Sequence, residues 1–441
     1  MFTSCSSLWT DFHCVDADKT RVYVERSKSS PINLWLDGAE ALPSHNPLLQ
    51  IIPHVLPRLK SVVILGTPEN LQDVTARLSH PAPLLEDMMI DGRPRNSFSR
   101  DYPTLAPTLF NEDLSSLRKL FVQGVHTTLP WRNMVNLTSF TLSGSPEKDE
   151  ITIRQLLDFL ENAPGLLKVK LKNATPTSGA QNGRLVSLPC LTKLVINGGE
   201  PSSLLLDHLL IPVGAKVALE FEVKSPDAPL EDYLPRALGN LGNLSNFTNI
   251  GIYLGSSLTH MKFSGPNGQV SALPCWGFHD PPFNATCKAL QSLALFDAAT
   301  VLQLEIIGGR LPSGSHLPHQ AFAPMKGLRT LKLARCPDLL SFIHALYPNR
   351  SQPNILVFPG LEELVLSLGV TKQFDIESIA EMAAARALRG AKLKLVHFVC
   401  STKPPASLLG VAKHVSRVRI GSVWHGMEDD SAVDSSNDGF A

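Results

Sequence analysis

A short apolar pattern recurs along the chain and restricts its fold more than any other feature. Each copy has an apolar residue, two variable positions, and then two apolar residues separated by one position, as in Leu117 to Val122 and Leu166 to Leu171. Because side chains alternate across a β-strand, each copy is typical of a short strand with one face in the core. Clear copies begin at Leu59, Leu85, Leu117, Leu137, Leu166, Leu191, Leu290, Leu328, Leu361 and Leu393, and weaker ones at Phe247 and Val415.

The spacing of these copies indicates a repeat architecture. Most successive clear copies begin 20 to 33 residues apart, which is close to the period of leucine-rich repeats. One repeat has no partner for its apolar face, so neighbouring repeats must stack and their strands form a parallel sheet. We therefore predict an α/β leucine-rich-repeat solenoid, with a curved parallel sheet on the concave side and helices on the convex side. The alternative is an ordinary α/β domain whose strands share the pattern.

Segments between the copies have apolar residues at helical spacing, as the return helices of such a solenoid require. In Ile151 to Asn162 these residues are Ile153, Leu156, Leu157 and Leu160, and Pro164 prevents the helix from continuing. Further helices are predicted over Glu69 to Leu78, Ser202 to Leu209, Leu339 to Leu346 and Ile376 to Arg389.

The chain divides into three predicted regions. Residues 1–45 form a leading segment with one strand around Leu34-Trp35-Leu36, and residues 46–425 form the irregular repeat array. Prolines in the stretch 264–286 predict a long loop or a break in that array. Residues 426–441 are acidic and rich in small side chains, so they are expected to be a disordered tail.

Composition narrows the possible partners and compartments. Lys+Arg and Asp+Glu both total 40, so the chain has no net charge to attract nucleic acid or an anionic membrane surface. The seven cysteines are odd in number and scattered, which is typical of free thiols in a reducing compartment. The first residues lack the pattern of a secretory signal peptide. The expected location is therefore cytoplasmic or nuclear.

Three short N-terminal motifs resemble the segment that follows the F-box in a large group of fungal F-box proteins. These motifs are Ser6-Ser7-Leu8-Trp9-Thr10, the run Thr20 to Pro31, and Leu34-Trp35-Leu36. The resemblance implies an irregular leucine-rich-repeat tail that recognises substrates for an SCF-type ubiquitin ligase. Only five residues precede Ser6, so the F-box that binds the Skp adaptor, and through it cullin, is expected to be largely missing here. The chain is then either a truncated F-box protein or a free-standing leucine-rich-repeat scaffold without a ubiquitin role.

The sequence contains no constellation typical of catalysis or metal binding. It lacks HExxH, GxSxG, P-loop and dinucleotide-binding patterns. Asp11, His13, Cys14 and Asp16 lie close together, but their spacing matches no standard zinc pattern. We therefore expect a protein-binding module that is not an enzyme and has no catalytic residues, cofactor or metal.

The variable positions of the predicted strands contain several lysines. In a leucine-rich repeat these positions face the concave side, where a lysine-rich surface would bind an acidic or phosphorylated segment of a protein substrate. The alternative is a solvated sheet face on which lysines only maintain solubility. The candidate partner-binding residues are Lys119, Lys168, Lys170, Lys172, Lys193 and Lys332.

Overall fold

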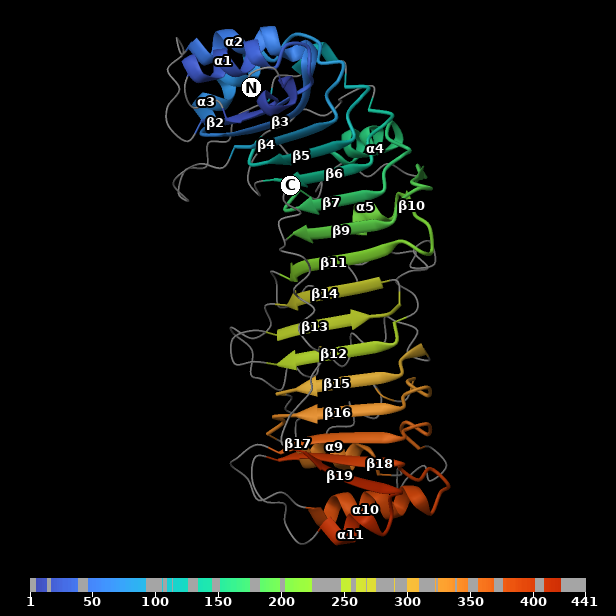
Figure 1. Cartoon of the computed structure of the whole chain (residues 1–441). Coiled ribbons are helices and arrows are strands. Elements are labelled where there is room, and N and C mark those ends of the chain that lie inside the picture. Colours follow the sequence, from blue (N-terminus) through green and yellow to red (C-terminus); the bar gives the residue numbers. More distant parts are fainter. Residues whose placement is uncertain are drawn as a thin grey trace. The chain divides into compact units, whose positions relative to one another are not determined.

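The computed structural model divides into two compact units. Unit 1 comprises Met1–Phe221 and Glu231–Asn243, and unit 2 comprises Glu222–Leu230 and Leu244–Ala441. Both units combine parallel strands with helices, so the predicted α/β class is confirmed (Figure 1). The structure describes residues 5–13, 17–38, 47–92, 105, 109–112, 114–125, 134–144, 151–174, 183–198, 203–223, 247–254, 259–266, 268–274, 289, 300–308, 322, 324–337, 339–347, 356–368, 376–400 and 408–421.

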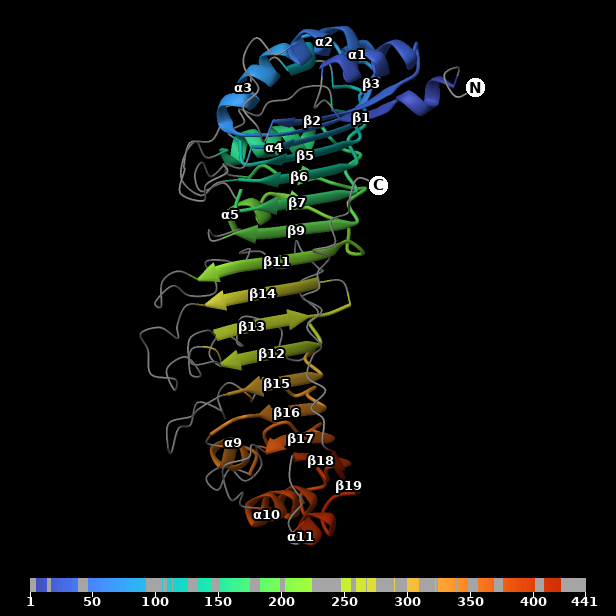
Figure 2. The ribbon, with the colours of Figure 1, turned by 60° about the vertical axis from the view of Figure 1, so that its left-hand side comes forward.

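The main sheet of unit 1 follows the order of the chain. Each strand pairs in parallel with the next one, from β1 through β7 and on to β9 and β11 (Figure 2). A separate parallel pair is formed by β8 (Val186–Ser187) and β10 (Leu209–Leu210). The strands of the main sheet are β1 (Asp11–His13), β2 (Ile32–Gly38), β3 (Leu59–Gly66), β4 (Asp87–Asp91), β5 (Lys119–Gln123), β6 (Ser139–Ser143), β7 (Lys168–Lys172), β9 (Lys193–Gly198) and β11 (Lys216–Val223).

The same turn precedes successive strands of this sheet. The backbone N–H of Leu117 donates to the carbonyl of Leu114 at 3.0 Å, and Leu137 donates to Met134 at 3.0 Å. The leading leucine of each predicted copy therefore closes a tight turn and enters the core, where Leu117 and Leu137 are buried. The alternating apolar pair of each copy then forms the buried face of the strand, as predicted.

The three helices that apolar spacing predicts in unit 1 form, and one of them is shorter than predicted. Helix α4 begins with a capping box in which Thr152 and Gln155 each accept a hydrogen bond from the other's backbone N–H. Helix α5 is shorter than predicted, because Leu209 and Leu210 pair with β8 instead of extending it. The helices are η2 (Ser6–Trp9), α1 (Ala17–Arg26), α2 (Pro47–Val55), η3 (Leu56–Arg58), α3 (Pro68–Arg77), η4 (Leu109–Glu112), α4 (Ile153–Glu161) and α5 (Ser203–Leu206).

Residues of the N-terminal motifs that resemble those of F-box proteins pack against one another. The ring of Trp9 lies 5.1 Å from that of Tyr23, and the guanidinium of Arg26 lies 4.5 Å above the Trp9 ring. Ser27 follows helix α1 and accepts a hydrogen bond from Arg58 at 3.2 Å. These segments therefore form η2, α1 and β2 at the start of unit 1.

The sheet of unit 2 is mostly parallel. Strands β12, β15, β16, β17, β18 and β19 pair in parallel in chain order. The predicted copy at Leu290 to Leu295 lies outside the described residues. The elements are β12 (Asn249–Leu254), β13 (Thr259–Ser264), β14 (Gly268–Pro274), β15 (Gln303–Ile307), β16 (Thr330–Ala334), α9 (Leu339–Ala345), β17 (Glu363–Leu368), α10 (Ile376–Ala387), β18 (Leu395–Cys400), α11 (Leu408–Ala412) and β19 (Arg417–Gly421).

Two strands of unit 2 depart from the predicted parallel arrangement. Strand β13 pairs antiparallel with both β12 and β14. The connections after Leu254 and Ser264 are far shorter than the dozen or so residues that a parallel crossover needs, so the chain must turn back directly. Of the long loop or break in the array predicted over 264–286, the loop is wrong for Gly268–Pro274, which form β14, and residues 275–286 lie outside the described part.

A buried arginine connects three segments of unit 2. Arg386 of α10 is completely buried, and its Nη1 donates to the carbonyls of Leu346 at 3.5 Å and Val357 at 2.8 Å. Its Nη2 donates to the carbonyl of Phe358 at 2.6 Å. Burial lowers the pKa of Arg386 to about 10, so it stays protonated at neutral pH. The guanidinium thereby links α10 to the end of α9 and to the turn before β17.

Candidate functional site

Five lysines share one face of the unit 1 sheet. Lys168 of β7, Lys193 of β9 and Lys216 of β11 occupy the same register position on consecutive strands. Neighbouring strands lie about 4.8 Å apart, so these three side chains form a row across the sheet. Lys170 and Lys172 extend along β7 on the same face, because side chains alternate. We call these five residues the lysine face.

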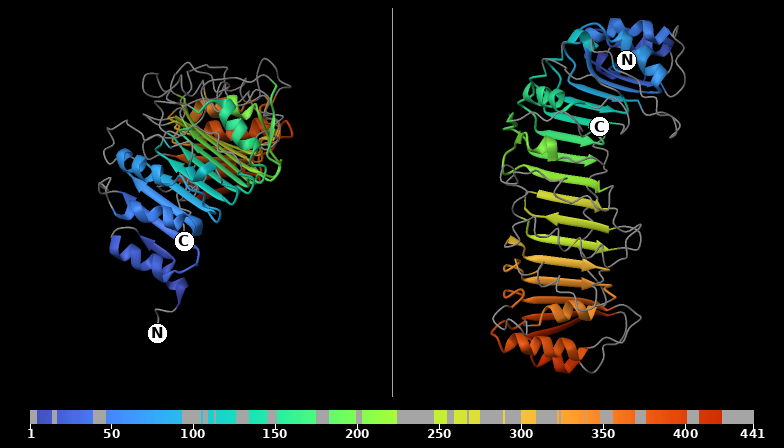
Figure 3. Two further views of the ribbon diagram at one scale, coloured as in Figure 1. Left: turned by 90° about the horizontal axis from the view of Figure 1, so that it is seen from above. Right: turned by 180° about the vertical axis from the view of Figure 1, so that it is seen from behind.

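The opposite face of this sheet is covered by helices. Phe140 of β6 points away from the lysine side, and its ring lies 4.4 Å from that of Phe159 in α4. Val169 and Leu171 of β7 are buried on the same side. Figures 1 and 3 show α4 and α5 behind the strands in one view and in front of them in the reverse view. The lysines therefore lie on the side of the sheet without these helices.

Most amino groups of the lysine face have no acidic partner. Within the described ranges, Lys168, Lys172, Lys193 and Lys216 form no ion pair. Glu220 of β11, on the same face, accepts a hydrogen bond from Asn197 at 2.8 Å. Like charges in register on neighbouring strands destabilise a sheet. An anion bound on this face would remove that repulsion.

The structure brings together four of the six predicted lysines and separates two. Lys119 of β5 forms an ion pair with Asp87 at 3.5 Å, and Ser139 of β6 lies between it and Lys168. Lys332 lies on β16 of unit 2, where its register neighbours are Glu305 and Val365. Lys332 therefore has no lysine beside it on either adjacent strand. The predicted ribbon is reduced to Lys168, Lys170, Lys172 and Lys193.

Lys216 belongs to the lysine face but was not predicted. Its strand has the same alternating apolar pair, Val217 and Leu219, but Gly214 stands where the register would place the leading leucine. A turn of the same length still precedes the strand, since the N–H of Ala215 donates to the carbonyl of Pro212 at 2.9 Å. The alternation alone would have revealed this strand.

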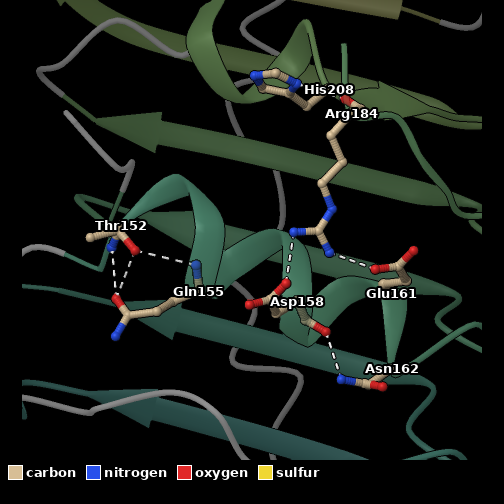
Figure 4. Close-up of polar contacts among 7 residues, drawn as sticks. All are labelled: Thr152, Gln155, Asp158, Glu161, Asn162, Arg184 and His208. Carbon is tan, nitrogen blue, oxygen red and sulfur yellow. Dashed lines mark hydrogen bonds and ion pairs between the residues drawn. The ribbon is translucent and has the colours of Figure 1, made fainter. Parts of the chain in front are cut away.

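Arg184 is the centre of a polar cluster on the helix side of unit 1 (Figure 4). Its Nη1 donates to Asp158 at 2.7 Å and its Nη2 donates to Glu161 at 2.5 Å, both on α4. The hydrogen bond to Asp158 is the main reason that the pKa of Arg184 is raised. His208 Nδ1 donates to the Arg184 carbonyl at 2.7 Å. Both carboxylates are engaged by the arginine, so the cluster fastens α4 to the segment before β8.

The residues considered for a metal near the N-terminus have structural contacts instead. Asp11 of β1 accepts a hydrogen bond from Asn33 of β2, and the ring of His13 lies 4.9 Å from that of Trp35. Cys14 and Asp16 lie outside the described residues. Across the described part of the chain, no three His, Cys, Asp or Glu residues are grouped to hold a metal ion. No helix among the described residues is long and apolar enough to cross a membrane.

No protein-family model matches the chain, and no curated protein matches it. Its function must therefore be inferred from the sites themselves.

Proposed function

We propose that this chain is a leucine-rich-repeat module that binds an acidic segment of a partner protein on its lysine face. The observation that carries the proposal is the row of Lys168, Lys193 and Lys216, which lie in register and have no ion pair among the described residues. Lysines that served only solubility would alternate with acidic residues in the row, whereas both register neighbours of Lys193 are lysines. A partner with carboxylate or phosphate groups would complement this row.

The repeated local structure supports the leucine-rich-repeat assignment. The same turn precedes strands in both units, for example at Leu117 and Leu361, whose N–H groups donate to carbonyls three residues earlier. Within each unit the neighbouring strands of the main sheet then pair in parallel, except at β13 and β14. These features favour a solenoid with the strands on its concave side and helices on its convex side.

The resemblance of the N-terminal motifs to those of F-box proteins supports a more specific role. In that role the chain is the substrate-recognition arm of an SCF-type ubiquitin ligase in the cytoplasm or nucleus. The alternative is a free-standing leucine-rich-repeat scaffold with no ubiquitin role. Sequencing of the transcript upstream of the Met1 codon separates the two. An encoded F-box there would support the ligase role, and its absence, together with acidic-peptide binding, would support the scaffold.

The lysine face itself is tested by charge reversal. A fluorescent glutamate-rich peptide is titrated with the wild-type chain and with the Lys168→Glu/Lys172→Glu/Lys193→Glu variant. We expect the variant to bind at least about tenfold more weakly, since three attractive contacts become repulsive. Lys332→Glu is the matched control, because Lys332 lies on an equivalent strand position without lysine neighbours. Equal affinity of the triple variant and the wild type would refute the proposal.

A further inference from the structure

A column of hydroxyl groups lies directly beside the lysines of β7. Strand β6 presents Ser139, Thr141 and Ser143 on the face of the sheet that the lysines occupy. The register pairs Ser139 with Lys168, Thr141 with Lys170, and Ser143 with Lys172. Each register pair therefore places one hydroxyl beside one lysine, and Lys170 of the middle pair also interacts with another group. We call the three β6 residues the hydroxyl column.

The hydroxyl column is available to a ligand. Ser139, Thr141 and Ser143 are half-buried, and their side chains make no hydrogen bond to another described residue. By contrast, Thr138, one position before the strand, donates its hydroxyl to the carbonyl of Arg118 at 3.0 Å. The Thr138 hydroxyl at the turn thus bonds to the backbone, whereas the three hydroxyls on the sheet face have no hydrogen bond to a described residue.

The paired columns suit a phosphoryl group better than a carboxylate. A phosphate monoester is close to a dianion at neutral pH and has three acceptor oxygens. A carboxylate has one charge and two oxygens. Strands about 4.8 Å apart place a hydroxyl and an ammonium group on two sides of one bound phosphoryl group. Rungs two residues apart are separated by roughly 6.6 Å, which is also the spacing of alternate residues in an extended peptide.

We infer that the partner of the lysine face is a phosphorylated protein segment, with phosphoserine or phosphothreonine at alternate positions. This inference rests on the proposed function and specifies its ligand. The hydroxyl column supplies neutral donors, and Lys168, Lys170 and Lys172 supply charge. Nucleic acid is disfavoured because its phosphodiesters have a single charge and two free oxygens, and because the chain has no net positive charge.

The experiment compares four fluorescent probes by anisotropy at fixed ionic strength. They are Gly-pSer-Gly-pSer-Gly, the same peptide with glutamate for phosphoserine, the unmodified serine peptide, and a single-stranded RNA of ten uridines. The protein variants are Ser139→Ala/Thr141→Val/Ser143→Ala and, as a matched control, Ser187→Ala on the exposed face of β8. Thermal melting of each variant shows that it remains folded.

We expect the wild-type chain to bind the phosphopeptide at least about tenfold more tightly than the glutamate peptide. The hydroxyl-column variant should lose most of that preference while its affinity for the glutamate peptide stays within about twofold. Ser187→Ala should behave as the wild type does.

Other outcomes overturn the inference in distinguishable ways. Equal binding of the phosphopeptide and the glutamate peptide would refute phosphoryl recognition and leave the proposed function standing. No binding of either peptide would refute both. Tighter binding of the RNA would reassign the lysine face to nucleic acid. A hydroxyl-column variant that keeps the full preference would show that Ser139, Thr141 and Ser143 do not contact the phosphate.

Discussion

Substitution of Arg386 tests whether a buried cation without a carboxylate stabilises unit 2. Arg386→Met keeps most of the apolar stem and removes every donor of the guanidinium. The carbonyls of Val357 and Phe358 then lose hydrogen bonds of 2.8 and 2.6 Å in a site closed to water. The contact with Leu346, at 3.5 Å, contributes less.

Two effects of opposite sign set the change in the free energy of unfolding that Arg386→Met causes. Each buried carbonyl left without a donor costs about 1–3 kcal/mol, although Phe358 still accepts the N–H of Leu361 at 3.0 Å. Removal of the cation also relieves its desolvation penalty, which offsets part of the loss. We therefore expect Arg386→Met to lower the free energy of unfolding by about 2–4 kcal/mol. Arg386→Lys should be intermediate, because one ammonium group cannot reach every acceptor that the planar guanidinium engages.

Urea unfolding followed by circular dichroism measures this difference, and hydrogen exchange locates it. The exchange of peptides that contain Leu346 and Phe358 should accelerate, because the guanidinium holds both segments. Arg389→Met is the control, since Arg389 is exposed in the turn that follows the same helix and should change stability by no more than about 0.5 kcal/mol. If Arg386→Met were as stable as Arg389→Met, the guanidinium would not link these segments energetically.

Two further predictions concern an ion pair and a glycine. Lys394 donates to Glu362 at 2.7 Å and thereby lowers the pKa of that carboxyl below its ordinary value of 4.5. A lowered folded-state pKa gives a stabilisation that is present above the ordinary range and is lost as pH falls through the folded-state pKa. NMR titration of Lys394→Met should show the Glu362 pKa returning upward, and an unchanged pKa would contradict the assigned cause. Gly308 has φ +77°, and a Cβ there would lie 2.1 Å from the carbonyl oxygen of Leu254. Gly308→Ala should lower the free energy of unfolding by more than about 2 kcal/mol, whereas Gly390→Ala, with φ +76° and open space, should lose only about 1 kcal/mol in the same urea assay. Equal losses would mean that the Leu254 contact is relieved by a small backbone shift.

Local patterns in the sequence predicted most elements of the fold. The copies beginning at Leu117 and Leu166 coincide with β5 and β7, because alternation and the leading leucine are properties of a few adjacent residues. Helix α4 was predicted within two residues at its start and one at its end, since its apolar spacing is also local. Its capping box satisfies the first N–H groups of the helix through Thr152 and Gln155, which are equally close in sequence.

The candidate site was only partly predictable, because local patterns reach over only a few adjacent residues. Lysines at the variable positions of a strand must share one face, so Lys168, Lys170 and Lys172 were placed together by sequence alone. Their alignment with Lys193 and Lys216 depends on the register between strands. That register is set by the packing of buried side chains from several repeats, which no single segment encodes.

Apolar periodicity within short windows is enough to predict most of the strands and helices and most of the residues that face the core. It does not predict that β13 turns back antiparallel, that Lys216 completes the lysine face, or that Arg386 is buried. Each of these depends on contacts between residues distant in the chain. The energy of those contacts comes from packing and hydrogen bonding that exist only after the repeats have stacked.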